Sequence, residues 1–499
     1  MSNNNSNKIG FLGNSSIYMF SSVFSFAVSI LVLPVYTRYL SPSDFGIVVL
    51  FMMFGTLLIG FLSISLHFAT YRYYFKYKDN LEKFRILNST NMVFLLLIFL
   101  LSGGIIYFSS EWFSSILFDS LLTKRLIQLS FLSGCMEYLV LYMITLLSAE
   151  IRSIPFTVIT VSRIILNTAL SFYFIFQYSL TYMARINAML ITQGVIVLCL
   201  IMLTKNMFSS RISLDSLKKS LKFTFPTIPQ QLIGMIHGSF DKTMLNKFTG
   251  LGSVGFYSFG QRFSLVLKAI MDSVDKVWNP FFLNKAHENS KKSKQEIVKR
   301  FYELSFFYMI LGLCLIYFSE EMIKLLTTKE FYPSMYVVPV YVYYYLFAII
   351  GTLTMNQVSY SEKMIYILPA SIVSVIINIS LNIFLIPKFG AIGAAGATAI
   401  AALFAHMIML YYGMKLFPLP LGIMKLLRLY LIVMGLTIFV YPIMAMEINI
   451  FIKLFIKLVI IATFILLAIK LNYISLSTIF YQLNKLKILF NKQLQNGYH

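Results

Sequence analysis

The sequence predicts an all-α polytopic membrane protein of about fourteen transmembrane helices, arranged as two pseudo-symmetric six-helix bundles plus two extra C-terminal helices. Hydrophobic residues make up 58% of the chain and charged residues 12%, whereas soluble domains are about 45–50% apolar. Long apolar runs, such as 92–107 and 450–469, approach the ~20 residues that cross a ~30 Å hydrocarbon layer as a helix. A third observation is a weak sequence repeat that relates the two halves of the chain.

The apolar runs place the individual spans in chain order. We expect them near residues 12–34, 46–66, 90–109, 126–147, 154–177, 184–204, 223–246, 254–277, 301–319, 335–357, 364–386, 391–412, 427–446 and 450–469. No ~10-residue segments of alternating hydrophobicity occur, which excludes an outer-membrane barrel. The first apolar stretch lacks a small-residue cleavage site, so we expect it to be a retained helix.

The orientation in the membrane follows from the positions of lysine and arginine, because short cytoplasmic loops carry an excess of both. Placing the N-terminus in the cytoplasm puts 26 loop and tail cations inside and 7 outside. We therefore expect a bacterial inner (cytoplasmic) membrane protein with both termini cytoplasmic. This topology accounts for much of the net charge of +22. Nucleic acid is excluded as a partner because the basic residues are spread over many short loops.

An internal repeat appears at a shift of about 209 residues, where Thr37-Arg38-Tyr39-Leu40 and Phe45-Gly46 correspond to Asn246-Lys247-Phe248-Thr249 and Val254-Gly255. It predicts an N-terminal bundle at 1–205, a basic cytoplasmic linker at 206–222 and a C-terminal bundle at 223–415. Two additional transmembrane helices at 416–470 and a cytoplasmic tail at 471–499 have no counterpart in the repeat.

The stretch 223–282 places ionisable residues where lipid is expected. Charges at the bilayer centre cost about 2.5–3.5 kcal/mol or more, so they normally face a cavity. On the eighth span, Arg262, Lys268 and Asp272 lie with two further ionisable residues on one arc of about 140°. Arg262 has no carboxylate three or four positions away and is a candidate for a transport path. Lys268 and Asp272 are either path residues or a mutually neutralising pair.

Arg163 is likewise a cation near the middle of an apolar helix. A guanidinium donates two parallel hydrogen bonds to a diphosphate and stays charged at any working pH. The alternative is a buried partner such as Glu137 on the preceding span.

The seventh span also has a polar face, with Gln230, His237 and Asp241 on one arc. His237 is a candidate proton sensor or a hydrogen-bonded packing residue. Asp241 and Lys242 are candidates for gating or coupling, together with Asp272. Glycan recognition would use scattered cavity amides, for which we single out Gln230, Gln231 and Asn378.

Catalytic, metal and cofactor sites are not predicted. The three cysteines lie alone in separate apolar segments, no histidine has zinc-site spacing, and there is no phosphate-binding loop or nucleophile elbow. Any uphill transport must therefore draw on an ion gradient, the membrane potential or consumption of the substrate on the far side.

Four motifs carry a resemblance to a known family. They are Leu33-Pro34-Val35-Tyr36-Thr37-Arg38-Tyr39-Leu40-Ser41-Pro42-Ser43-Asp44-Phe45-Gly46, then Asp241-Lys242 with Gly255-Phe256-Tyr257-Ser258 and Gln261-Arg262-Phe263, then Trp278-Asn279-Pro280-Phe281, and Pro387-Lys388-Phe389-Gly390-Ala391-Ile392-Gly393. In this order the chain resembles the polysaccharide-exporter branch, which includes O-antigen flippases, of the superfamily that also contains multidrug and toxin extrusion transporters and the lipid II flippase.

The resemblance implies a flippase that carries an undecaprenyl-diphosphate-linked oligosaccharide repeat unit of O-antigen, capsule or a related surface polysaccharide by alternating access through a cationic cavity. It places Arg262 in that cavity. Expected partners are this glycan lipid and the bilayer, with polysaccharide polymerase and chain-length regulator proteins as further candidates and a monomer as the working unit. A cation-coupled multidrug or metabolite antiporter is the alternative. A membrane glycosyltransferase or polymerase is disfavoured because the outer loops are short.

Overall fold

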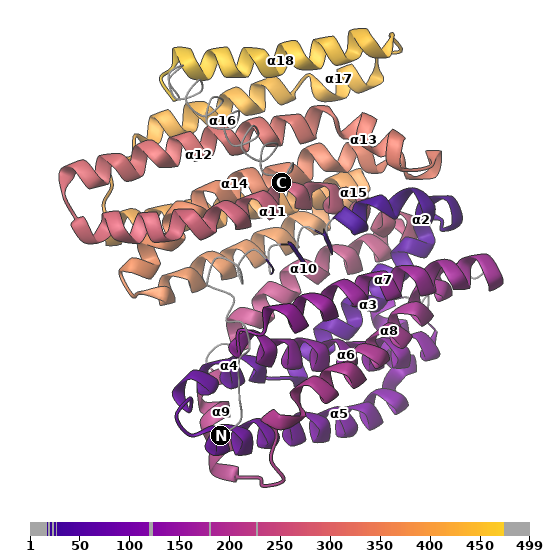
Figure 1. Ribbon diagram of the computed structural model, residues 1–499. Coiled ribbons are helices and arrows are strands. Elements are labelled where there is room, and N and C mark those ends of the chain that lie inside the picture. Colours follow the sequence, from indigo (N-terminus) through magenta and orange to yellow (C-terminus); the bar gives the residue numbers. More distant parts are fainter. Residues whose placement is uncertain are drawn as a thin grey trace, which may run out of the picture. The chain divides into compact units, whose positions relative to one another are not determined.

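The computed structural model describes residues 27–118, 123–178, 181–225 and 228–473, together with 17, 20, 21, 24 and 25. Every regular element in this part of the chain is a helix (Figure 1). Ten of the described helices are long and apolar enough to cross a membrane. The all-α, polytopic prediction is therefore confirmed.

Of the other expected spans, the first lies largely outside the described residues, and its visible end is the apolar helix Ala27–Tyr39. The seventh and eighth are helices that carry several charges, and the eleventh and twelfth are merged into one element. Several helices are longer than predicted: residues expected to span at 90–109 belong to a helix of 38 residues, Leu81–Phe118. At 1.5 Å per residue such a helix is about 57 Å long and exceeds a ~30 Å hydrocarbon layer at its ends.

The chain divides into two compact units, each described here by itself. Unit 1 comprises Met1–Ser258, Leu326–Phe331 and Asn382–Ala391. Its helices are α2 (Leu33–Tyr39), α3 (Pro42–Leu62), α4 (Leu66–Lys76), α5 (Leu81–Phe118), α6 (Lys124–Ala149), α7 (Ser153–Tyr178), α8 (Tyr182–Thr204), α9 (Leu214–Thr224), α10 (Ile228–Thr249) and the start of α11 (Leu251–Glu288).

The local chemistry of the Ser41-Pro42-Ser43-Asp44 motif explains where α3 begins. Ser41 is the N-cap, and its hydroxyl accepts a hydrogen bond from the Asp44 backbone N–H. Asp44 accepts in return from the Ser41 backbone N–H at 2.9 Å. Pro42 occupies the first turn, where its missing N–H costs nothing. The motif is thus a capping box that starts the helix at one defined residue.

Two glycines hold α3 close to the start of α11. A Cβ at Gly46 would overlap the carbonyl oxygen of Leu251, and a Cβ at Gly255 would overlap the carbonyl oxygen of Pro42. In the 209-residue repeat, Leu251 corresponds to Pro42 and Gly255 to Gly46, so the repeat exchanges the two contacts. A reciprocal contact of this kind is what a pseudo-two-fold relation produces.

Unit 2 comprises Phe259–Leu325, Tyr332–Leu381 and Ile392–His499. Its described helices are the rest of α11, α12 (Lys291–Tyr317), α13 (Ser319–Leu326), α14 (Ser334–Tyr360), most of α15 (Ile367–Leu416), α16 (Ile423–Thr437), α17 (Val440–Ala445) and α18 (Ile450–Lys470). The C-terminal helices α16 and α18 pack against one another and against α12 (Figure 1).

The long element α15 is a helical hairpin. Gly390 has a positive φ of 54° and breaks the helix three residues after Pro387. Ser374 donates to the carbonyl of Ala401, and Asn378 donates to the Thr398 hydroxyl at 3.3 Å. In both pairs the two partners lie at nearly equal distances from residue 388, one on each side, so the two arms run antiparallel. The eleventh and twelfth predicted spans correspond to these two arms.

The predicted linker, residues 206–222, includes most of α9, which ends at Thr224, and is hydrogen-bonded to the N-terminal part of α5. Backbone N–H groups of Ser209 and Ser213 donate to the side chains of Ser89 and Thr90. Asn88 donates to the carbonyl of Met207 at 2.9 Å. The predicted tail is described only as far as Tyr473, and its remaining residues lie outside the described part.

Candidate functional site

Arg163 lies in a polar network between three apolar helices of unit 1. The network joins α6, α7 and α8. Arg163 donates to a Glu137 carboxylate oxygen at 2.5 Å, and Gln193 donates to the same oxygen at 3.1 Å. Ser133 donates to the Gln193 amide oxygen at 3.0 Å. Each polar side chain thereby compensates another inside an apolar helix packing.

Of the two interpretations left open for Arg163, the structure contains the ion pair with Glu137. The pair is not sealed: the Arg163 side chain is 32% exposed and the Glu137 side chain 44%. A guanidinium has five N–H donors, and the ion pair uses one of its nitrogens. The ion pair with Glu137 therefore leaves other N–H groups of the Arg163 guanidinium unused.

Helix α11 separates an ionisable face from an apolar face along unit 2. Phe263, Leu267 and Met271 are buried. Lys268 and Asp272 are exposed, while Arg262 is partly buried. This pattern agrees with the arc calculated from the sequence, and it turns the charged residues away from the unit's own core.

Lys268 and Asp272 form an ion pair along one turn of α11. The Lys268 Nζ donates to both Asp272 carboxylate oxygens, at 2.9 and 2.7 Å. Their side chains are 48% and 59% exposed. The pairing alternative is therefore what the structure contains, and at this exposure such a pair contributes only about 0.3–0.5 kcal/mol to the helix.

Asp241 on α10 is a buried carboxylate in unit 1. Tyr257 donates its hydroxyl to one carboxylate oxygen at 2.6 Å, and Asn382 donates its amide to the other at 2.6 Å. The three residues come from α10, α11 and α15, and Asn382 is 141 positions from Asp241. Lys242, the next residue, is partly buried. The cluster thus joins a carboxylate, a phenol and an amide from three helices.

The amide side chains predicted to bind the glycan lie in different environments. Gln231 accepts a hydrogen bond from Ser65 in unit 1. Asn378 is fully buried and holds the two arms of α15 together through Thr398. Gln230 and His237 belong to α10, but their side chains lie outside the described part.

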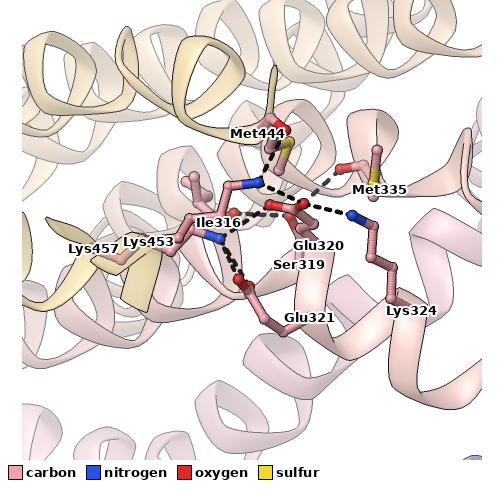
Figure 2. A network of polar contacts seen from close by, with 9 residues as sticks. All are labelled: Ile316, Ser319, Glu320, Glu321, Lys324, Met335, Met444, Lys453 and Lys457. Atoms are coloured by element: carbon pink, nitrogen blue, oxygen red, sulfur yellow. Dashed lines mark hydrogen bonds and ion pairs between the residues drawn. The ribbon is translucent and has the colours of Figure 1, made fainter. Parts of the chain in front are cut away.

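Sequence reasoning missed a cluster of charges in unit 2 that joins α13 to α18. Figure 2 shows Glu320 at its centre, accepting from Lys324 at 2.7 Å, Lys453 at 2.8 Å and Lys457 at 3.3 Å. Lys457 also contacts both carboxylate oxygens of Glu321, at 2.7 and 2.8 Å. Lys453 and Lys457, spaced one helical turn apart in an otherwise apolar span, were the signal available in the sequence.

The charges of this cluster compensate one another. The side chains of Glu320, Lys457 and Lys453 are only 3%, 1% and 9% exposed. Burial alone would raise the pKa of Glu320, but hydrogen bonds from Lys324 and Lys453 and the charge of Lys457 bring that pKa below its ordinary value. The hydrogen bond to Glu320 in turn raises the pKa of Lys324. We interpret the cluster as a structural connection for α18, because its charges are mutually satisfied.

Comparison with known proteins gives three findings. A family model described as polysaccharide biosynthesis protein matches residues 11–284. An uncharacterized membrane protein of Haemophilus influenzae is 23% identical over 287 residues, which are 56% of this chain and 67% of that protein.

Among solved structures, the lipid II flippase MurJ in an inward closed conformation superposes with a TM-score of 0.71, at 18% identity over 92% of this chain and 98% of that one. An inward-facing multidrug resistance MATE family transporter superposes with a TM-score of 0.61, at 15% identity over 81% and 97% of the two chains. These likenesses show that the chain shares the fold of these two structures.

Proposed function

Because the chain belongs to the polysaccharide biosynthesis protein family, we propose that it is a flippase that moves an undecaprenyl-diphosphate-linked oligosaccharide repeat unit to the outer face of the cytoplasmic membrane. The repeat unit would belong to O-antigen, capsule or a related surface polysaccharide. Alternating access between two bundles, at 1–205 and 223–415, would carry it.

The observation that carries this proposal is the half-open Arg163–Glu137 pair inside an apolar helix packing. An ion pair this exposed contributes about 0–1 kcal/mol to stability, so exchanging one partner costs little. A diphosphate offers more oxygen acceptors and more negative charge than one carboxylate, and arginine suits it because of its planar fork.

We therefore assign Glu137 the role of a resident counter-ion. In the empty protein it neutralises Arg163 and keeps the guanidinium oriented. An arriving diphosphate would replace it, and Glu137 would regain Arg163 when the substrate leaves. This exchange would prevent the lipid from staying bound, which a transporter requires.

Arg262 and Lys268 are assigned the corresponding role on α11. They lie on the ionisable face of that helix, and the family motif Gln261-Arg262-Phe263 includes the first of them. Gln230, Gln231 and Asn378 remain candidates for contacts with the sugars, with Asn378 acting through the α15 hairpin it stabilises.

Coupling to an ion gradient is assigned to Asp241, with Lys242, His237 and Asp272 as further candidates. The buried carboxylate of Asp241, which accepts hydrogen bonds from one phenol and one amide, supports this assignment because a carboxylate is an oxygen ligand for a small cation. The same observation favours the second candidate function, a cation-coupled multidrug or metabolite antiporter.

The remaining assignments follow from the lysine and arginine distribution and from the family. Both termini would be cytoplasmic, 206–222 would be a cytoplasmic linker, and 416–470 would add two spans before the tail at 471–499. The chain would work as a monomer, with a polysaccharide polymerase and a chain-length regulator as partners.

Reconstituted proteoliposomes separate the two functions. A fluorescent undecaprenyl-diphosphate-linked oligosaccharide and a fluorescent lipophilic cation are supplied in parallel, and their movement is followed with a membrane-impermeant quencher. We expect movement of the first, and its loss in Arg262→Ala while the variant remains folded. The matched control is Arg211→Ala, which removes an exposed Arg–Glu pair of α5 and the linker. Movement of the cation alone would establish the antiporter instead.

A further inference from the structure

A cavity of about 600 Å³ lies within unit 2, at the end of the spans where lysine and arginine gather. Its wall comes from residues 295–303 in the N-terminal half of α12, from the segment before α16 and its first turn, and from the residues that follow α18. The residues that matter for its chemistry are Lys299, Tyr302, Glu303, Lys425, Asn472 and Tyr473. The cavity belongs to none of the contacts assigned to transport above.

Lys425 is held in a fixed position in this wall. Its ammonium donates to the carbonyl of Asn472 at 2.8 Å and lies over the rings of Tyr302 and Tyr473, at 4.8 and 5.0 Å from their centroids. The hydroxyls of the same two tyrosines donate to the carbonyls of Gly422 and Lys425, at 2.9 and 2.5 Å. Aromatic faces stabilise a cation without neutralising it, so its full charge remains available to a ligand.

The balance of charge in the cavity is positive. Its carboxylate, Glu303, is already paired with Arg300 at 2.6 Å. Neither Lys299 nor Lys425 has a carboxylate within ion-pair distance among the described residues. Two ammonium groups therefore face the cavity beside a carboxylate whose charge is offset.

The position of the cavity along α12 suits a headgroup. The helix has 27 residues, which at 1.5 Å each is about 40 Å. That length exceeds a ~30 Å hydrocarbon layer, and the apolar stretch expected to span the membrane begins at residue 301, so Lys299 precedes it and lies at the level of the headgroups. Basic pockets between membrane helices on the cytoplasmic side bind anionic headgroups.

We propose that this cavity binds a phosphate ester through Lys299 and Lys425, the source being the headgroup of an anionic phospholipid or a soluble phosphate compound. The ammonium groups supply charge-assisted hydrogen bonds to the phosphate oxygens. A bound ester joins α12, α16 and the end of α18, and so secures the two additional C-terminal helices to unit 2. The proposal is independent of the transported substrate.

The test uses the full-length protein in a neutral detergent and counts bound molecules by native mass spectrometry. The probes are phosphatidylglycerol, phosphatidylcholine and inorganic phosphate, each titrated separately. The variant is Lys299→Met with Lys425→Met, and the matched control is Lys291→Met with Lys292→Met on the first turn of the same helix. Since removing a near-surface lysine weakens anion binding about fivefold, we expect about a 25-fold loss in the variant and none in the control.

Glu303→Gln is a second variant that keeps both lysines and tests the charge balance. The substitution removes the carboxylate that pairs with Arg300, so the cavity becomes more positive and should bind the phosphate probes more tightly. Loss of phosphatidylglycerol alone from the lysine variant identifies the headgroup, and equal loss of inorganic phosphate identifies a soluble source. Either result supports the site. Unchanged binding of both probes in the lysine variant, or weaker binding in Glu303→Gln, overturns it.

Discussion

Replacing Glu320 by glutamine tests whether buried charges fasten α18 to unit 2. The substitution keeps the shape of the side chain and removes the charge that Lys324, Lys453 and Lys457 share (Figure 2). Removing one partner of a buried ion pair costs about 3–5 kcal/mol. We expect a loss near the lower end, about 3 kcal/mol, because Lys457 keeps Glu321 and because glutamine still offers an acceptor. Loss of the contact with Lys324 adds little to this destabilisation, since the Lys324 side chain is 45% exposed.

Tryptophan fluorescence can measure this loss during unfolding in mixed micelles with increasing dodecyl sulfate. The chain has two tryptophans, so Trp112→Phe leaves the buried Trp278 as a single reporter in unit 2. Adding Lys453→Met to Glu320→Gln should recover part of the loss, because the uncompensated buried ammonium is then replaced by an apolar side chain. Glu296→Gln, which opens a partly exposed pair with Lys285, should cost about 1 kcal/mol or less. A Glu320→Gln protein as stable as that control would refute the reasoning.

Three further predictions concern acid stability, packing and coupling. Because the pKa of Glu320 is lower in the folded protein than its ordinary value of 4.5, the unfolded chain takes up the proton first, and the free energy of unfolding should fall as the pH drops below that value; Glu320→Gln should flatten this acid limb in an unfolding titration. Gly46→Ala should destabilise the protein by about 1–3 kcal/mol through overlap of α3 with α11, whereas Gly104→Ala, where a Cβ meets nothing within 4 Å, should not, as thermal unfolding can show. Asp241→Asn should remove the dependence of transport on an imposed proton or sodium gradient, measured in the proteoliposomes, while leaving binding of the substrate intact.

Local patterns in the sequence were sufficient to predict where the helices lie. Apolar runs located the spans, and the charged arc on α11 followed from helical periodicity alone, because both signals lie within one element. The repeat correctly aligned Gly46 with Gly255. Helix ends were less accurate, since α5 continues well beyond its apolar part into polar residues that still favour a helix.

Spacing did not fix the partners across the fold: Glu137 was only one of two alternatives for Arg163, and Asn382 was not considered as a partner of Asp241. Glu137 is 26 positions from Arg163, and Asn382 is 141 positions from Asp241. No periodicity connects such residues, and only tertiary packing brings them together. The buried lysines of α18 show the same limit: their span is apolar enough to be recognised, but the carboxylates that make it tolerable lie on α13.

The most direct test of the central claim measures initial flipping rates in proteoliposomes against substrate concentration for Arg163→Gln and Glu137→Gln. If Arg163 holds the diphosphate and Glu137 is its resident counter-ion, the first variant should need far more substrate to reach half-maximal rate. The second should need less substrate than the unmodified protein and release it more slowly. Equal effects of the two substitutions, or no effect of either, would contradict the account, because a purely structural pair loses the same interaction from either side.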